Sequence, residues 1–305
     1  MLVSVVIPNY NHFLYLKQRI DTVLSQTYDN FEVIILDDLS TDNSRQIIES
    51  YRGVHKISVI HYNDINSGSP FIQWAKGLEH AKGEYVWIAE SDDWCEVNFL
   101  EEIMSYVRQY PAANLLYCNT VLIKGSEFLM PINVNHKDFE YYDENELLKK
   151  KLLHGLSINN ASAVVFKKEP ALLYIQELRW YQKHGDYFFW IQIAKTGSAI
   201  FINKPLNFCR ILESSVTRQA WHKEVRSLIE HIQIFKLLNQ CIASLSIRQK
   251  MYFFDSWGLS FMHMFTCIKT KRKKKYYFSL MHASRFNIYF SLRVLYFITR
   301  KKLII

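Results

Sequence analysis

The first 120 residues alternate between short apolar runs and amphipathic stretches, and this alternation limits the fold more than any other feature. The apolar runs are continuous, which is typical of strands buried on both faces of a parallel sheet. Such strands need helices on either side, so the pattern predicts an α/β fold with a mostly parallel sheet flanked by helices. The predicted strands are Leu2–Ile7, Phe31–Leu36, Ile57–Tyr62, Tyr85–Ala89 and Asn114–Cys118, with helices at 13–26, 42–51, 70–82 and 96–110.

The alternation becomes irregular after residue 120. An apolar run at Ser162–Phe166 predicts one more strand, and Asp186–Lys195 predicts a helix. Beyond Thr217 the pattern is largely helical and rich in aromatic residues. We therefore predict one domain at 1–217 and a helical extension at 218–305 that is basic and aromatic.

The net charge of +8 is unevenly distributed, because no acidic residue follows Asp255. Removing the eleven basic charges of that segment leaves −3 for residues 1–255. A segment that mixes cations with aromatic residues favours binding to an anionic membrane surface. The alternative is a pair of terminal helices packed on the first domain, with a solvated basic loop. No recognition motif accompanies the charge, so nucleic acid is not an expected partner. The basic residues are Lys269, Lys271, Arg272, Lys273, Lys274, Lys275, Arg285, Arg293, Arg300, Lys301 and Lys302.

The cysteines and the ends of the chain indicate a compartment. The five cysteines are scattered and form no C-x-x-C pair, which favours a reducing environment over a disulfide framework or a zinc site. No basic region precedes the strand at Leu2–Ile7, so we expect no signal peptide. The uncharged run from Ser256 to Ile268 is too short to span a bilayer. We expect a cytoplasmic protein that contacts the inner face of the membrane peripherally, if at all.

Polar residues follow three of the predicted strands. The first strand leads into Pro8-Asn9-Tyr10-Asn11, the second into Asp37-Asp38, and the fourth into Glu90-Ser91-Asp92-Asp93. Ligands of open α/β sheets bind outside the carboxyl ends of the strands, so these three segments should converge on one rim.

Up to five carboxylates would then lie on that rim. Like charges brought together are costly unless a cation or hydrogen-bond donors compensate. A divalent cation with oxygen ligands, Mg²⁺ or Mn²⁺, would compensate them and typically bridges carboxylate to phosphate. The alternative is that these acids cap the following helices, which is the interpretation we favour for Asp42.

The order and spacing of these motifs resemble those of family-two glycosyltransferases. This family belongs to the nucleotide-diphospho-sugar transferase superfamily and has the GT-A fold, which is Rossmann-like. The resemblance is strong over about 3–118 and weaker over 155–217. The segments that carry it are Ser4–Asn11, Leu24–Tyr28, Phe31–Asp42 and Lys82–Trp94.

The resemblance implies a role for the first two segments of the rim. Pro8 and Tyr10 match the loop that lines the nucleotide pocket. Asp38 matches the acid that hydrogen-bonds the base, and Asp37 is its neighbour. By the same resemblance 1–118 would bind the nucleotide sugar and 119–217 the acceptor.

The third segment matches the family's D-x-D motif. Glu90, Ser91 and Asp92 occupy its three positions, with Glu90 where the family commonly has aspartate. The last carboxylate of the motif holds the metal on the diphosphate. Asp92 and Asp93 are therefore the candidate metal ligands, and we favour Asp92.

A glycosyl transfer needs two further functions. The departing diphosphate gains negative charge, which a metal neutralises as a Lewis acid. The acceptor hydroxyl must lose its proton to a positioned base, for which Asp186 is the candidate by resemblance; capping of its helix is the alternative. A single displacement would invert the anomeric configuration.

The expected reaction follows from this resemblance. The donor would be a nucleotide-diphosphate sugar, UDP by resemblance, and the acceptor a hydroxyl of a glycan or a lipid-linked molecule. The expected setting is the biosynthesis of a polysaccharide or a surface glycan.

The sequence departs from the family at two places that matter for the donor. Trp74-Ala75 stands where many relatives have Arg-Asn, so Lys76 is the candidate cation for the diphosphate; a solvated helix lysine is the alternative. Leu212 stands where relatives often have a histidine that would ligate the metal. Arg210, two residues earlier, remains a candidate phosphate ligand.

Other functions fit less well. A dehydrogenase would need G-x-G-x-x-G after the first strand, which is absent. A nucleotidyltransferase that forms sugar nucleotides also needs paired carboxylates and a metal, but the expected glycine-rich basic loop is missing. The alternative outside catalysis is a degenerate transferase domain that acts as a membrane-associated scaffold.

Overall fold

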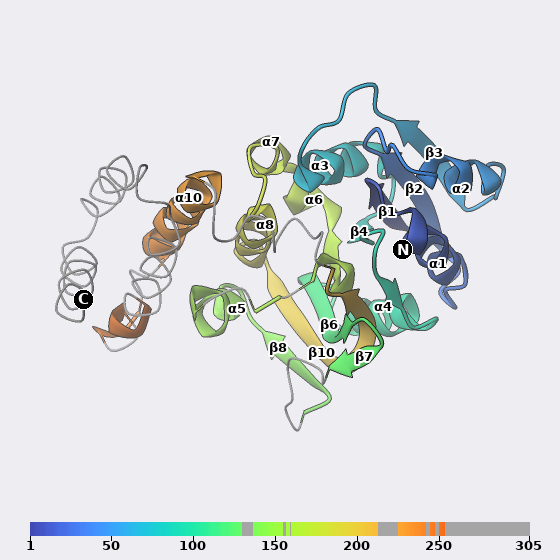
Figure 1. Ribbon diagram of the computed structural model, residues 1–305. Coiled ribbons are helices and arrows are strands. Elements are labelled where there is room, and N and C mark those ends of the chain that lie inside the picture. The colour runs from blue at the N-terminus through green and yellow to red at the C-terminus, as the bar shows by residue number, and fades with distance from the viewer. Residues whose placement is uncertain are drawn as a thin grey trace. The chain divides into compact units, whose positions relative to one another are not determined.

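A computed structural model of the protein describes residues 1–129, 137–154, 157–158, 160–212, 225–241, 245–247 and 250–253 (Figure 1). The chain divides into two compact units. The first unit contains Met1–Leu147 and Ile158–Leu212, and the second takes in Leu148–Ser157 and the residues after Leu212. The boundary predicted between residues 217 and 218 falls outside the described residues.

The first unit is built on one mixed sheet with the strand order β3-β2-β1-β4-β9-β6-β10-β5. Strand β7 pairs with β6, and β8 pairs with β10. The strands are β1 Val3–Asn9, β2 Phe31–Asp37, β3 Ile57–Tyr62, β4 Tyr85–Ile88, β5 Trp94–Cys95, β6 Ala113–Lys124, β7 Glu127–Leu129, β8 Phe139–Tyr142, β9 Val164–Lys167 and β10 Ser198–Arg210.

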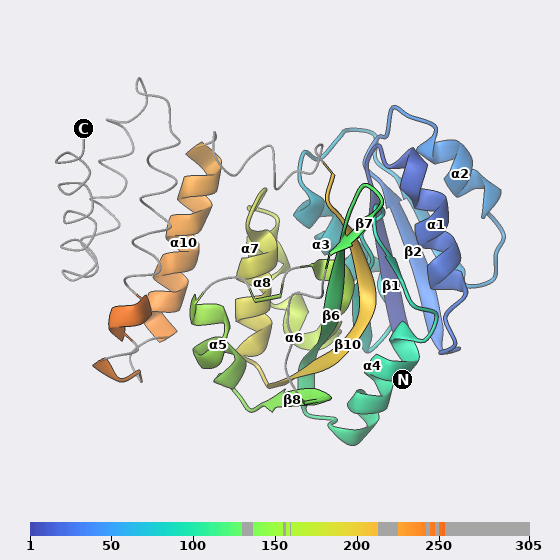
Figure 2. The ribbon, with the colours of Figure 1, turned by 60° about the horizontal axis from the view of Figure 1, so that its bottom comes forward.

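Helices cover both faces of this sheet (Figures 1 and 2). Leu16 of α1 and Phe99 of α4 pack on the face of β1 that carries Val5. Helix α3 lies on the opposite face, where a Cβ on Gly77 would come within 2.3 Å of Val6. The first unit contains α1 Phe13–Leu24, α2 Ser44–Ser50, α3 Pro70–His80, α4 Phe99–Gln109, α6 Lys168–Leu172, α7 Ile175–Leu178 and α8 Gly185–Ala194, with the 3₁₀ turn η2 Ala161–Ala163. Helix α5 Glu146–Lys150 crosses the boundary between the units, and the second unit contains the 3₁₀ turn η1 Leu152–His154 and helix α10 Val225–Cys241.

The predicted α/β fold is confirmed, and the sheet adds two features that the sequence pattern did not predict. Strands β1 to β4 are parallel, as expected from their continuous apolar runs. Strand β9 lies between β4 and β6 and is antiparallel to both. Strand β10 was not predicted, because Asn203, Lys204 and Pro205 interrupt its apolar pattern; its register with β6 shifts at the same place.

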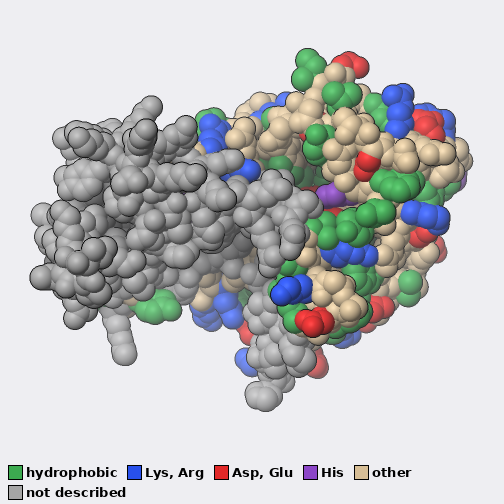
Figure 3. Space-filling model, in the orientation of Figure 1, with side chains coloured by type: hydrophobic (Ala, Val, Ile, Leu, Met, Phe, Trp, Pro, Cys, Tyr) green, Lys and Arg blue, Asp and Glu red, His purple; other side chains and the backbone are tan. Residues whose placement is uncertain are grey.

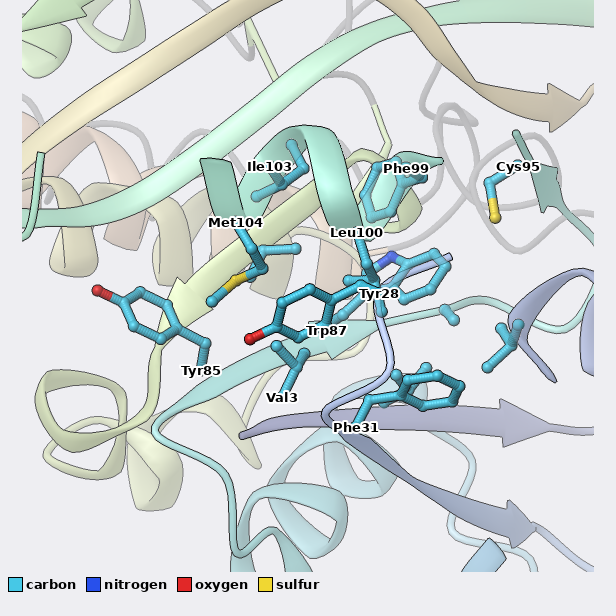
Figure 4. Close-up of a cluster of buried hydrophobic side chains, with 14 of the residues drawn as sticks. Val3, Tyr28, Phe31, Tyr85, Trp87, Cys95, Phe99, Leu100, Ile103 and Met104 are labelled. Atoms are coloured by element: carbon cyan, nitrogen blue, oxygen red, sulfur yellow. The ribbon is translucent and has the colours of Figure 1, made fainter. Parts of the chain in front are cut away.

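A cluster of buried hydrophobic side chains supports the carboxyl end of β4 (Figure 4). The Trp87 ring stacks on Phe99 with centroids 4.4 Å apart, a contact worth about 1 kcal/mol beyond the burial of its area. The Trp87 indole Nε1 donates to the carbonyl oxygen of Ser162 at 2.8 Å. Because both faces of β4 are packed, the loop that follows it starts from a fixed position.

Within the second unit, helix α10 accounts for part of the predicted helical extension. Phe235 of this helix stacks on Phe253 with ring centroids 5.5 Å apart. The basic cluster between Lys269 and Lys302 lies outside the described residues, so its membrane role stays a prediction. Among the helices that the structure describes, none is long and apolar enough to cross a bilayer. Figure 3 shows acidic, basic and apolar side chains interspersed over the coloured surface.

Candidate active site

The ends of β1 and β2 are joined through Asp37. Its Oδ1 accepts from Asn9 Nδ2 at 2.7 Å and from Ser40 Oγ at 2.6 Å, and its Oδ2 accepts from the Ser40 backbone N–H at 2.9 Å. Asp37 is 3% exposed. Its carboxylate therefore shapes the loop after β2, beside the residue that we expect to meet the base.

Asp38 organises the segment after β3. Its Oδ1 accepts from Asn63 Nδ2 (2.5 Å), the Ser67 backbone N–H (2.8 Å) and Gln73 Nε2 (2.9 Å), and its Oδ2 accepts from Ser67 Oγ (2.7 Å). Lys76 Nζ donates to Asn63 Oδ1 at 2.5 Å. The structure thus places the Lys76 ammonium in the network around Asp38.

The loop after β1 reaches the segment that follows β4. Pro8 is buried in β1, whereas Tyr10 is 46% exposed. His12 Nδ1 lies 2.8 Å from Ser91 Oγ. The sequence prediction missed His12, although it directly follows the polar run that ends at Asn11.

Glu90 is held at three points. Its backbone N–H donates to Ser162 Oγ at 3.0 Å, and its carbonyl accepts from Arg19 Nε at 2.9 Å. Its Oε1 accepts from the indole Nε1 of Trp74 at 2.7 Å. Trp74 and Glu90, two of the departures from the family pattern, are therefore in direct contact.

Asp92 and Asp93 have different surroundings. Asp93 is 1% exposed, and its carboxylate accepts from Asn160 Nδ2 (2.8 Å), Ser162 Oγ (2.7 Å) and the Arg210 backbone N–H (3.1 Å). Asp92 is half-buried, and within the described part of the chain its carboxylate receives no hydrogen bond. Asp93 therefore anchors the loop, while the Asp92 carboxylate remains available to a ligand.

A buried arginine lies beneath this acidic loop. Arg19 is fully buried, with its guanidinium 4.0 Å from Asp93 Oδ2 and 5.7 Å from the centroid of the Trp87 ring. Among the described residues, its Nη1 and Nη2 have no hydrogen-bond partner. Sequence reasoning missed Arg19, although it falls on the buried face of α1 with Leu16 and Ile20.

Arg210 closes the other side of the loop. Its guanidinium lies between two aromatic rings, 4.7 Å from the centroid of Tyr15 and 4.2 Å from that of Trp94. It also donates to the carbonyl of Asp92 and to Gln18 Oε1. In this arrangement Arg210 links β10 to α1 and holds the backbone of Asp92.

Burial and repulsion raise the pKa values of two acids of the rim, Glu90 and Asp93. Burial, followed by the charge of Asp92, raises the pKa of Glu90 to about 8 against the opposing hydrogen bond from Trp74. The same two causes raise the pKa of Asp93 to about 6, against the opposing effects of Arg19 and Asn160. A cation bound beside these acids would favour their ionised forms and would so oppose both shifts.

Asp186 is the second residue of α8 and is half-buried. Its Oδ1 accepts from the Tyr187 backbone N–H at 2.7 Å, so it engages the first turn of the helix. Gly185 before it packs on Phe71, where an added Cβ would lie 2.6 Å from the ring. The start of α8 is thereby held against α3, the helix that carries Trp74.

The donor set fits a metal that is shared with a phosphate ligand. Across the described residues, no group of three or more His, Cys, Asp or Glu side chains could enclose a metal ion. Mg²⁺ typically binds one or two carboxylates and completes its shell with water and substrate phosphates. The half-buried Asp92 carboxylate suits that mode, whereas Asp93 already satisfies protein donors.

The fold and the acidic rim define a transferase of the GT-A type. The family model described as Glycosyl transferase family 2 matches residues 4–172, which is more than half of the chain. The chain therefore belongs to glycosyl transferase family 2, and it is a glycosyltransferase.

Known relatives and solved structures agree with this assignment. The chain is 24% identical to TuaG of Bacillus subtilis, named for teichuronic acid biosynthesis, over 77% of this chain and 89% of TuaG. It is 32% identical to the glycosyltransferase GlyA of Streptococcus pneumoniae over 75% of this chain and 33% of GlyA. The crystal structure of S. aureus TarS 1–349 in complex with UDP-GlcNAc has the same fold, with a TM-score of 0.60, 18% identity and coverage of 90% of this chain and 85% of that one.

Proposed function

We propose that this protein is an inverting glycosyltransferase that moves a sugar from a nucleoside-diphosphate donor to a hydroxyl of a glycan or a lipid-linked acceptor. UDP is the proposed nucleotide, since TarS, of the same fold, was solved with UDP-GlcNAc. The proposed setting is the synthesis of a cell-surface polysaccharide. TuaG and the poly(ribitol-phosphate) β-N-acetylglucosaminyltransferase TarS, both relatives by sequence, are named for such polymers.

One observation carries this proposal. Segments that follow three parallel strands meet at one rim, through the contact of Asn9 with Asp37 and that of His12 with Ser91. Asp92 lies on this rim with a carboxylate that no described residue binds. A phosphate-bound cation is the partner that such a carboxylate suits.

We assign the following roles to the chain's own residues. Asp38 accepts a hydrogen bond from the base on Oδ2, which receives one protein hydrogen bond, from Ser67, whereas Oδ1 receives three. Pro8 and Tyr10 lie beside the nucleotide. Asp92 holds Mg²⁺ or Mn²⁺, which when bound neutralises the charge that develops on the diphosphate. Asp186 takes the proton of the acceptor hydroxyl.

The remaining candidates keep the rim in shape. Asp37 fixes the loop beside Asp38, and Asp93 fixes the loop beside Asp92. Lys76 donates to Asn63, which in turn donates to Asp38, so its charge lies near the first of these loops. Arg210 donates to the backbone carbonyl of Asp92, so its charge lies near the second. We therefore propose that these two cations act on the diphosphate indirectly.

A donor screen tests the proposed function. The melting temperature would be measured with UDP-, GDP-, CMP- and dTDP-sugars, each with and without Mn²⁺. We expect one UDP-sugar to raise the melting temperature in the presence of Mn²⁺ and to do so much less without it. No shift with any nucleotide sugar would contradict the proposal, and a shift with another nucleotide would correct the base.

A further inference from the structure

Trp74 is a buried aromatic residue with a polar contact in the candidate site. It is 2% exposed, and its ring packs against Phe189 and Trp190 of α8 at centroid distances of 6.2 and 5.8 Å. Phe71, one helical turn earlier, lies edge-on to it at 5.1 Å. These contacts fix the direction in which the indole N–H points.

That N–H points at Glu90 Oε1, 2.7 Å away. The backbone of Glu90 is held independently by Ser162 and Arg19. Glu90 Oε2 receives no hydrogen bond from the part of the chain that the structure describes. One carboxyl oxygen is thus held by Trp74, and no described residue donates to the other, in a residue two positions before Asp92.

The chemistry of this pair favours a hydroxyl ligand. An indole donates one hydrogen bond and carries no charge, so it orients the carboxyl group without forming the ion pair that a lysine or arginine would form. The second carboxyl oxygen can then exchange a hydrogen bond with an O–H group, whether the carboxyl is ionised or neutral. A ribose offers such hydroxyls next to the diphosphate that Asp92 would bind through its metal.

We propose that Trp74 is a positioning residue that orients the Glu90 carboxylate toward a ribose hydroxyl of the donor. Its aromatic neighbours hold the indole, the indole holds Oε1, and Oε2 exchanges a hydrogen bond with the ribose hydroxyl. This inference rests on the proposed function, since it requires a nucleotide on the rim.

Discrimination between ribose and deoxyribose tests the proposal. The dissociation constants of UDP, 2′-deoxy-UDP and 3′-deoxy-UDP would be measured with Mn²⁺ by calorimetry. We expect the wild type to bind UDP about tenfold more tightly than at least one deoxy analogue, the usual effect of leaving one hydrogen-bonding group of a site unpaired. We expect Trp74→Phe, which keeps a ring but removes the N–H, to reduce this ratio to about twofold or less.

The aromatic cluster offers a matched control. Trp190 packs against Trp74, and its Nε1 is buried with no hydrogen-bond partner among the described residues. Trp190→Phe removes an indole from the same cluster without removing a hydrogen bond, so it should retain the wild-type ratio. In the Glu90→Ala background the ratio should already be lost, and Trp74→Phe should change it no further.

The outcomes separate this inference from the proposed function. A wild type that binds UDP without discriminating the sugars would overturn the role of Glu90 and Trp74 alone. If Trp74→Phe kept the wild-type ratio of dissociation constants, the role of Trp74 would be overturned. The same conclusion would follow if Trp190→Phe lost as much of that ratio as Trp74→Phe. A wild type that binds none of the three nucleotides would contradict the proposed UDP donor itself.

Discussion

His12 Nδ1 lies 2.8 Å from Ser91 Oγ, so the loop after β1 touches the segment after β4 although 79 residues separate them. The contact occurs because β1 and β4 are neighbouring parallel strands whose carboxyl ends face the same way. The acidic residues of the third segment are thereby brought to the first loop. This relationship is the structural basis of the proposed donor site.

Ser162→Ala should destabilise the first unit. Ser162 is fully buried, donates to Asp93 Oδ2 and accepts from the Glu90 backbone N–H. Its loss leaves a buried donor unpaired, which costs about 1–3 kcal/mol. Urea unfolding measures the change. Ser50→Ala, at an exposed residue, should stay within about 0.5 kcal/mol of wild type; an equal loss in both variants would contradict the role of Ser162.

Asp42→Ala should destabilise two helices together. Asp42 Oδ2 accepts from the Phe13 N–H at the start of α1, and its Oδ1 accepts from the Ser44 N–H at the start of α2, both at 2.9 Å. Loss of a cap typically costs about 1–2 kcal/mol. Equal unfolding free energies of the variant and the wild type at pH 7 would rule out this double capping.

The Asp42 effect should depend on pH. Burial alone would raise the pKa of Asp42, but hydrogen bonds from Ser44 and Phe13 outweigh it and lower the pKa below its usual 3.8. A carboxyl with a lowered folded-state pKa stabilises the fold above the unfolded value and loses that effect as the pH falls through the folded value. The difference between wild type and Asp42→Ala should therefore be constant from about pH 5 to 7 and shrink below about pH 4. If the difference in unfolding free energy between wild type and Asp42→Ala grew as the pH fell, the result would contradict a lowered pKa of Asp42.

Leu39→Gly should stabilise the protein. Leu39 has φ of 60° and is 45% exposed, so it adopts the left-handed region without a large buried contact. That conformation costs a bulky residue about 1–2 kcal/mol, and glycine avoids this cost. The greater freedom of glycine in the unfolded chain then reduces the net gain in stability. We expect a gain of about 1 kcal/mol in thermal unfolding. Asn145→Gly, at φ of 63°, should gain less because asparagine tolerates this region, and a larger gain there would contradict the explanation.

Asp186→Asn should separate donor binding from transfer. The amide keeps the shape of the side chain but cannot take a proton. The dissociation constant for UDP with Mn²⁺ should stay within about twofold, while the transfer rate falls by about a hundredfold or more. Glu177→Gln, at an exposed acid on α7, should leave both unchanged. Wild-type turnover in Asp186→Asn would exclude it as the base.

The strands of the first 118 residues could be predicted because their signals are local. The run Val33–Leu36 of β2 is continuous and apolar, and a parallel sheet then determines which edge the end of the strand lies at. The insertion of β9 between β4 and β6 could not be predicted, because strand order is set by packing across the whole sheet. Strand β10 was hidden by Pro205 and its polar neighbours.

The sequence indicated the acids and Arg210, but not the contacts of Trp74 and Arg19 with Glu90. Asp92 follows a recognisable strand. Trp74 and Arg19, in contrast, contact Glu90 from positions 16 and 71 residues away in the sequence. Each of those two residues resembles an ordinary helix position when it is considered alone. Only the fold shows that the Trp74 indole meets Glu90, or that Arg19 lies beneath the acidic loop.

Calorimetry with UDP and Mn²⁺ tests the central claim most directly, that Asp92 joins a cation to the donor diphosphate. The wild type should bind UDP much more tightly with Mn²⁺ than without it, and Asp64→Asn, at an exposed acid after β3, should behave in the same way. Asp92→Asn should lose the Mn²⁺-dependent part of the affinity while keeping the wild-type melting temperature. Unchanged Mn²⁺-dependent binding in Asp92→Asn would contradict the account.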